Sequence, residues 1–145
     1  MRMTKNKRQV LEALACIDTA DNVYPPHHAT RVQELLRDNL GYGDFDLANL
    51  TRTLKALADQ GLVKFSTSSA DVSGDTFGCI SRRYEREMVQ YWPTDLDLDA
   101  MRVQYKITPE DYDLRFHNFF QRRYGLPELT MDEFREYNAR KAAGR

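Results

Sequence analysis

Cysteine is scarce in this sequence, and long apolar runs are missing. The 145 residues include only Cys16 and Cys79, too few for a disulfide framework, so we expect a reducing, cytoplasmic setting. No apolar run approaches the roughly 18 residues that a membrane-spanning helix needs. The first ten residues are basic but carry no apolar segment, so we expect no secretory signal. The length predicts one domain, or one domain with an appendage, that does not enter a membrane.

The chain also lacks an excess of either charge. It has 21 Lys and Arg against 22 Asp and Glu, a formal net charge of −1, which argues against a protein that coats nucleic acid through a generally basic surface. Any nucleic-acid-binding surface must therefore come from local clustering. Two basic clusters are present, and they consist of Arg2, Lys5, Lys7 and Arg8, and of Arg82, Arg83 and Arg86.

Motifs of catalysis and of metal binding are missing as well. The sequence has no Gly-rich phosphate loop, no nucleophile elbow and no HExxH zinc motif. His27 and His28 follow two prolines, but their spacing from Cys16 or Cys79 matches no common zinc pattern. We therefore expect neither an enzyme nor a metal site, and no cofactor.

What the first half of the sequence does contain is a series of amphipathic segments. Apolar residues recur at helical spacing over 5–16, and an Asp-, Asn- and Pro-rich loop follows over 18–28. Thr30 and Gln33 have the form of a capping box that opens a second helix, which Gly41 ends. These signals predict two short helices joined by a loop.

A third helix is predicted over 46–60, with Gly61 at the place of a left-handed C-terminal cap. Val63 then begins an extended run, a loop covers about 66–75, and extended stretches follow over 76–81 and 83–92. The helix has an apolar face spaced by three and four residues, formed by Leu47, Leu50, Leu54 and Leu57.

The polar residues of this third helix lie away from its apolar face. A helix that reads the major groove needs polar groups on the outward side of its N-terminal half. Arg52 could pair with guanine and Asn49 with adenine, and the small Thr53 could lie against a thymine methyl group. Thr51, Lys55 and Lys64 suit phosphate contacts, which position the protein without reading sequence. The alternative is an ordinary solvated helix face, because Arg and Lys are common on any surface helix.

The segment LTRTLKALADQGLV, residues 50–63, resembles the recognition helix and first wing strand of bacterial winged helix-turn-helix regulators. The resemblance covers about residues 4–92 and implies an α+β, mainly α, winged-helix domain over 1–92, with three helices and a β-hairpin wing. It implies DNA contacts for Asn49, Arg52 and Lys55. The expected wing loop carries acidic residues and no Lys or Arg, so Arg82 and Arg83 could take the place of basic wing residues, or could be a solvated strand end.

Residues 93–145 are expected to form a helical extension. Helices are predicted over 95–105, from Thr108 and Pro109 onward, and from a capping box at Thr130 and Glu133, with a fraying tail over 139–145. The middle helix carries an aromatic stripe that needs a partner surface, consisting of Tyr112, Phe116, Phe119, Phe120 and Tyr124.

Two functions from different classes follow from these observations. In the first, the chain is a sequence-specific regulator of transcription that binds double-stranded DNA with helix 46–60 and forms a homodimer through the aromatic stripe, which would match a palindromic site. The alternative for the stripe is the chain's own core. In the second, the winged helix binds a protein partner in a phage, plasmid or defence-related assembly, an interpretation that the near-zero charge, the acidic wing loop and the aromatic C-terminal segment favour.

Overall fold

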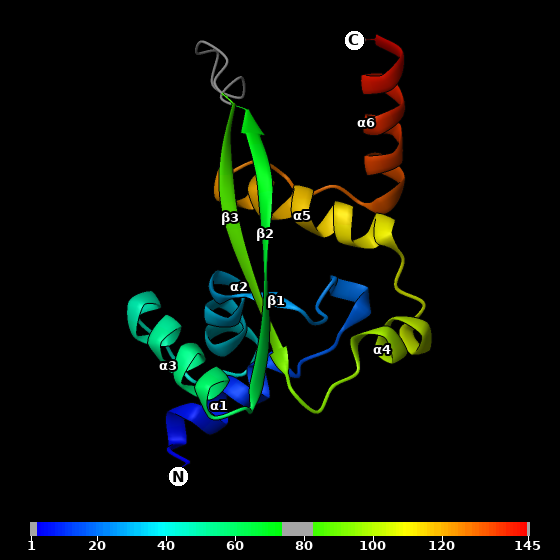
Figure 1. Cartoon of the computed structure of the whole chain (residues 1–145). Coiled ribbons are helices and arrows are strands. Elements are labelled where there is room, and N and C mark those ends of the chain that lie inside the picture. The colour runs from blue at the N-terminus through cyan, green and yellow to red at the C-terminus, as the bar shows by residue number, and fades with distance from the viewer. Residues whose placement is uncertain (1–2, 74–82, 145) are drawn as a thin grey trace. The chain divides into compact units, whose positions relative to one another are not determined.

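The computed structural model describes residues 3–73 and 83–144, and Figure 1 shows their helices and strands in chain order. The described chain is α+β and mostly helical, with one small antiparallel sheet. This confirms the predicted fold class as α+β and mainly α. The chain divides into two compact units, the first from residues up to 19 and 23–98, the second from 20–22 and 99–145.

The helices of the first unit surround a single apolar core. Each contributes residues spaced by three or four positions, so that one side of every helix is buried. Val10 and Leu14 come from the first helix and Val32 from the second, and all three are fully buried. The helical elements up to residue 59 are α1 (Lys5–Leu14), the 3₁₀ turn η1 (Thr19–Asp21), α2 (Ala29–Glu34) with its π-helical continuation η2 (Leu35–Asn39), and α3 (Leu47–Asp59).

The sheet has three antiparallel strands in the spatial order β1-β3-β2. β2 (Val63–Ser73) and β3 (Arg83–Pro93) form a hairpin in continuous register, from Val63 opposite Pro93 to Ser73 opposite Arg83. The short β1 (His27–His28) pairs with the other edge of β3. The base of the hairpin is attached to the core, because Val63 and Tyr91 are buried in it.

Two predictions around α2 were wrong. The predicted capping box is not formed, because α2 begins at Ala29 and the Gln33 side chain instead donates to the carbonyl of Phe45 at 2.7 Å. Residues 27 and 28 were placed in a loop but form β1. A two-residue strand has no periodicity of its own, and it exists only because β3 offers a free edge for its backbone groups.

The hairpin is longer than the sequence predicted. β2 continues through Ser73, so that most of the loop expected over 66–75 is strand. Ser and Asp disfavour strands on average, but cross-strand pairing with β3 outweighs that local preference. The strand predicted over 83–92 is confirmed, whereas the extended stretch predicted over 76–81 lies outside the described residues.

The helices at the end of the chain begin largely where capping signals predicted. α5 (Pro109–Arg123) has Thr108 as N-cap in a full capping box with Asp111. The predicted box before α6 (Met131–Gly144) is also formed, since Glu133 accepts from the Thr130 amide at 2.9 Å and the Thr130 hydroxyl accepts from the Glu133 amide at 3.2 Å. α4 (Leu98–Tyr105) starts three residues later than the expected 95.

The predicted fraying of the tail is wrong for residues 139–144, which continue α6 as regular helix. Alanine, arginine and lysine are all strong helix formers, so the composition of this stretch supports the helix.

Among the described residues, none of the helices is both long and apolar enough to cross a bilayer.

Candidate functional site

α3 is held firmly at both ends and along one side. Asp46 caps its N-terminus by accepting a hydrogen bond from the Asn49 amide at 3.1 Å. At the C-terminus, Gly61 has the predicted positive φ of 77°, and the Leu62 amide donates to the Leu57 carbonyl at 3.0 Å, as in a Schellman motif. The helix is therefore fixed in rotation by its core residues, Leu50, Leu54 and Leu57, which are at most 1 % exposed.

The outward side of α3 is exposed along its full length. Successive residues turn by about 100° around a helix axis, so residues 48, 52, 55 and 59 lie opposite the buried leucines. Ala48, Arg52, Lys55 and Asp59 are indeed exposed, and Asn49 flanks them. Three of the predicted DNA-contacting residues, Asn49, Arg52 and Lys55, thus share one exposed surface, which we call the outward face of α3.

Arg52 and Asn49 also contact each other. Nη1 of Arg52 donates a hydrogen bond to Oδ1 of Asn49 at 2.9 Å. The two residues are separated by three positions, which places their side chains on neighbouring rows of the helix. The contact joins the two side chains that were predicted to read bases.

The two threonines of α3 are engaged within the helix. The Thr51 hydroxyl donates to the Leu47 carbonyl at 2.9 Å, and the Thr53 hydroxyl donates to the Asn49 carbonyl at 3.0 Å. Both side chains are half-buried. A phosphate oxygen accepts hydrogen bonds and therefore needs a donor. In this arrangement the hydroxyl proton of Thr51 is directed to the Leu47 carbonyl and not outward to a phosphate.

Leu47 was predicted on the packing face, but it is 41 % exposed. It lies one turn before Leu50, at the very start of the helix, where the core no longer covers that side. Leu47 and the exposed Ala48 add apolar groups beside Asn49 at the N-terminal end of α3. Sequence periodicity missed this because it gives the direction of a side chain but not where the core ends.

The remaining predicted positions of the first unit lie on the hairpin. Lys64 is exposed and is paired with Trp92, one residue along the strand from the buried Val63, so that it belongs to the opposite face of the sheet. Arg83 occupies the first position of β3, opposite Ser73. Arg82 lies outside the described residues.

Acidic residues surround the start of α3. Asp44 and Asp46 are exposed there, and Asp46 serves as the cap. Asp38 is paired with Arg37, whose Nε and Nη2 donate to its two carboxylate oxygens at 2.8 and 3.0 Å. This hydrogen-bonded guanidinium holds the pKa of Asp38 below its usual value. Among the described residues, no ion pair is formed by Asp44 or Asp46 at this end of α3.

In the second unit, the aromatic stripe of α5 is partly exposed. Phe120 lies at the centre, with ring centroids 5.0 Å from Phe116, 5.2 Å from Phe119 and 6.3 Å from Tyr124. Phe116 and Tyr124 remain 38 % and 37 % exposed. Tyr112 accepts a hydrogen bond from Nε of Arg102 at 3.0 Å, which ties α4 to this stripe.

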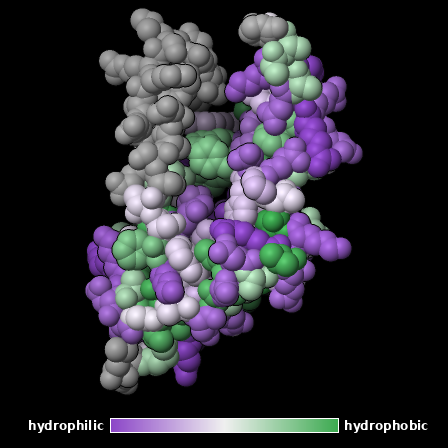
Figure 2. All heavy atoms as spheres, turned by 45° about the vertical axis from the view of Figure 1, so that its right-hand side comes forward, coloured by the Kyte–Doolittle hydropathy of each residue, from purple (hydrophilic) through white to green (hydrophobic). Residues whose placement is uncertain are grey.

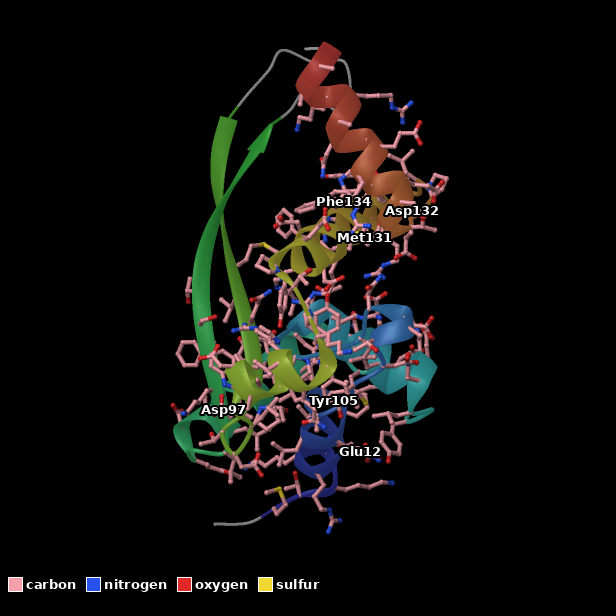
Figure 3. All side chains as sticks on the ribbon, turned by 90° about the vertical axis from the view of Figure 1, so that its right-hand side faces the viewer. Glu12, Asp97, Tyr105, Met131, Asp132 and Phe134 are labelled. Carbon is pink, nitrogen blue, oxygen red and sulfur yellow. The ribbon has the colours of Figure 1, made fainter. Side chains whose placement is uncertain are left out.

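α6 and the loop before it use the other side of α5. The side-chain amide of Asn118 donates to the Leu129 carbonyl at 2.9 Å and accepts from the Leu129 amide at 2.8 Å. The His117 ring lies 5.4 Å from Phe134 and 5.0 Å from Tyr137, and Figure 3 labels Phe134 near the start of α6. Among the described residues, these contacts of α5 with α6 and its loop run through His117 and Asn118.

Each unit also has a hollow in its surface. The larger, about 620 Å³, lies at the base of the hairpin and is lined mainly by apolar residues such as Leu11, Leu62 and Leu96. The smaller, about 240 Å³, lies between α5 and α6 beside His117 and Glu136. No three His, Cys, Asp or Glu side chains within the described part of the chain are grouped in a way that could hold a metal ion.

Comparisons of this chain with protein-family models, with curated proteins and with solved structures find no match.

Proposed function

We propose that the chain is a sequence-specific DNA-binding regulator, whose first unit is a winged helix-turn-helix and whose α3 enters the major groove. The observation that carries this proposal is the outward face of α3. Arg52, Lys55 and Asn49 are exposed together on a helix that three buried leucines hold in one orientation. A helix of this width fits the major groove, and its N-terminal half carries the groups that could reach base edges.

The order of elements supports the winged-helix assignment. α1, β1, α2 and α3 precede the β2–β3 hairpin, and the short β1 closes the sheet against β3. Three helical segments followed by a hairpin agree with the order that the resemblance of residues 50–63 implies. The link between η2 and α3, which is longer than a simple helix-turn-helix turn, contains two glycines with positive φ, Gly41 and Gly43.

The hairpin is the proposed wing. Its strands have 11 residues each, so at about 3.4 Å per residue the paired part is roughly 37 Å long. That is long enough for a segment far from α3 to reach phosphates beyond the groove that α3 would occupy. Lys64 near the base and Arg83 at the first position of β3 are the proposed wing contacts; Arg82, which lies outside the described residues, is proposed as a third.

The second unit is the proposed dimerisation element. Phe116 and Tyr124 are 38 % and 37 % exposed, whereas the printed contacts of α5 with α6 and the loop before it run through His117 and Asn118. A second copy of the same stripe would bury both aromatic faces and would place two α3 helices around a two-fold axis. Such a dimer would bind a palindromic site with half-sites spaced by a helical turn or a multiple of it.

A protein partner for α3 is the second candidate, and a specific group of residues favours it. Tyr42 and Leu47 are 38 % and 41 % exposed beside the acidic Asp44 and Asp46. The Tyr42 hydroxyl donates to Glu12, which fixes the ring at the surface and raises the pKa of Tyr42. Apolar groups ringed by carboxylates suit a basic protein surface better than a phosphate backbone.

The dependence of binding on salt separates the two candidates. We would measure the affinity of the wild type, Arg52→Ala and Lys55→Ala for a pool of mixed-sequence duplexes at several salt concentrations. Phosphate contacts release counterions, so log affinity should fall steeply and linearly with log salt, and Lys55→Ala should reduce the slope by about one contact. Arg140→Ala, an exposed arginine of α6, is the matched control and should leave both values unchanged.

Two outcomes would contradict the proposal. Absence of binding at low salt, or a flat salt dependence, would favour the protein-binding alternative.

The proposed dimer is tested separately. Sedimentation of Phe116→Asp should show the mass of a monomer with unchanged circular dichroism, whereas Phe65→Asp, which alters an exposed phenylalanine of β2, should leave the mass as in the wild type. If Phe116→Asp leaves the mass unchanged, the stripe is not the dimer contact.

A further inference from the structure

We propose that Asn49 and Arg52 act as one unit that reads a single guanine, with Arg52 as the contacting residue and Asn49 as its positioning residue. This inference rests on the proposed DNA-binding function and makes it more specific. Its alternative is that the two side chains read two different base pairs, Arg52 a guanine and Asn49 an adenine.

The first observation is the direct contact between the two side chains. Nη1 of Arg52 donates to Oδ1 of Asn49 at 2.9 Å. Arginine has high side-chain rotamer entropy. Because the hydrogen bond to Asn49 already restricts the Arg52 side chain in the free protein, less conformational entropy is lost when it binds a base. The remaining edge of the guanidinium, formed by Nε and Nη2, is then available for the two acceptors of guanine, O6 and N7.

The second observation is the chemical nature of the partner. Five other arginines of the described chain lie within 4.0 Å of a carboxylate, namely Arg31, Arg37, Arg102, Arg122 and Arg135. A carboxylate would compete with DNA for the guanidinium and would cancel its charge. Arg52 is oriented by a neutral amide instead, so its position is fixed while its positive charge is kept for the nucleic acid.

The third observation is that Asn49 is itself fixed in place. Its backbone amide donates to the Asp46 cap at 3.1 Å, and its carbonyl accepts from the Thr53 hydroxyl at 3.0 Å. The Asn49 side chain therefore starts from the capped first turn of α3, which Leu50 anchors to the core. A residue that positions another side chain must itself extend from a rigid part of the backbone, and the capped first turn of α3 meets this requirement.

The two interpretations, one shared guanine or two separate base pairs, differ in which base pairs respond to mutation. We would select preferred duplexes from a random pool with the wild type and then measure affinities for all single-base variants. If the pair reads one guanine, Arg52→Ala should lower discrimination at one G·C pair by about 10- to 100-fold. Asn49→Leu, which has a similar shape but no acceptor, should lower discrimination at that same pair by about 3- to 10-fold.

Asn49→Asp is the decisive variant. It keeps an acceptor for Arg52 but loses the Nδ2 donor that adenine recognition requires. Its carboxylate would compete with the guanine for Arg52, so binding to all sequences should weaken and the preference for the guanine should fall, but no second base pair should respond. If Asn49 reads adenine itself, Asn49→Asp and Asn49→Leu should both abolish preference at a second, neighbouring base pair.

Loss of preference at a second base pair, or an Asn49→Leu protein with unchanged discrimination, would overturn the inference. Either result would leave the salt-dependent binding of the wild type in place and would therefore not affect the proposed function. Absence of binding by the wild type at low salt would instead reject the proposed function and this inference with it. Thermal unfolding of each variant checks that the exposed substitutions leave the fold intact.

Discussion

α3 and α6 have nearly the same length, 13 and 14 residues, but they are held in very different ways. α3 buries three leucines in the core of the first unit, whereas α6 buries only Phe134. Hydrophilic side chains cover much of the visible face of α6 in Figure 2. A polar face has a defined direction only where the opposite face is anchored, so α3 can present side chains for recognition, and α6 depends on few local contacts.

Those local contacts are mostly polar. Arg135 donates to Glu110 of α5 through Nε and Nη2 at 3.1 and 2.9 Å, and the Thr130 capping box closes the first turn of α6. Exposed ion pairs contribute little, typically up to about 1 kcal/mol. The difference between the two helices can therefore be tested by removing the apolar anchor of each.

Leu54→Ala should have the largest effect. Leu54 is fully buried at the centre of the α3 face, and we expect a loss of about 4 kcal/mol in the free energy of unfolding of the first unit, with loss of any α3-dependent binding. The single tryptophan, Trp92, lies in β3 and reports this transition by fluorescence in urea. Asp59→Ala, an exposed change on the same helix, should alter stability by less than about 0.5 kcal/mol.

Phe134→Ala should have the next largest effect, but confined to the second unit. It removes the one buried side chain of α6 and its contact with the His117 ring, which we expect to weaken the packing of α6 on α5 by about 3 kcal/mol. Hydrogen exchange of the α6 amides should become faster, while the Trp92 transition stays in place. A parallel drop in the Trp92 transition would mean that the two helices do not differ as described.

A smaller effect is expected at the cap of α3. Asp46→Ala removes the acceptor for the Asn49 amide and should lower the free energy of unfolding by about 1 kcal/mol. Asp46→Asn keeps an acceptor, so we expect almost no loss of stability. If α3 binds DNA, Asp46→Asn should also bind more tightly at low salt, because it removes a negative charge beside the phosphates. Equal stability of the two variants in urea would contradict the role of the cap.

The smallest effect is expected from pH on the α5–α6 pair. Burial, and secondarily the charge of Lys141, lower the pKa of His117 below 6.5. The unfolded chain then takes up a proton before the folded one does, so the stabilising effect of neutral His117 is complete above pH 6.5 and is lost as the pH falls through the lowered pKa. Hydrogen exchange of α6 at pH 7.5 and 5.5 should show this, and His117→Gln should reduce the dependence.

The sequence predicted the parts of the fold that depend on local chemistry. The N-caps at Thr108 and Thr130, the C-terminal glycine of α3 and its buried Leu50, Leu54 and Leu57 are all where residue types and spacing placed them. Capping and periodicity act within one or two turns of helix, so a sequence window contains all the information that they need. The exposure of Asn49, Arg52 and Lys55 follows from the same periodicity.

Local chemistry was not sufficient where distant segments meet. Whether β1 exists, how far β2 continues and what Gln33 binds were decided by segments 10 to 64 positions away. The exposure of Leu47 depends on where the core ends rather than on the helix itself. None of these features leaves a periodic signal in the residues concerned.

The sequence by itself therefore determined the caps of α5 and α6, the glycine that ends α3 and the side of α3 that faces outward, because those depend on neighbours three or four residues apart. Tertiary structure decided the closing of the sheet by β1, the length of the hairpin and the firm anchoring of α3 in contrast to α6. The contact between the guanidinium of Arg52 and the amide of Asn49 is local, because the two residues are three positions apart on one helix. The closing of the sheet, the length of the hairpin and the anchoring of α3 depend instead on segments far apart in the chain, which a linear pattern does not contain.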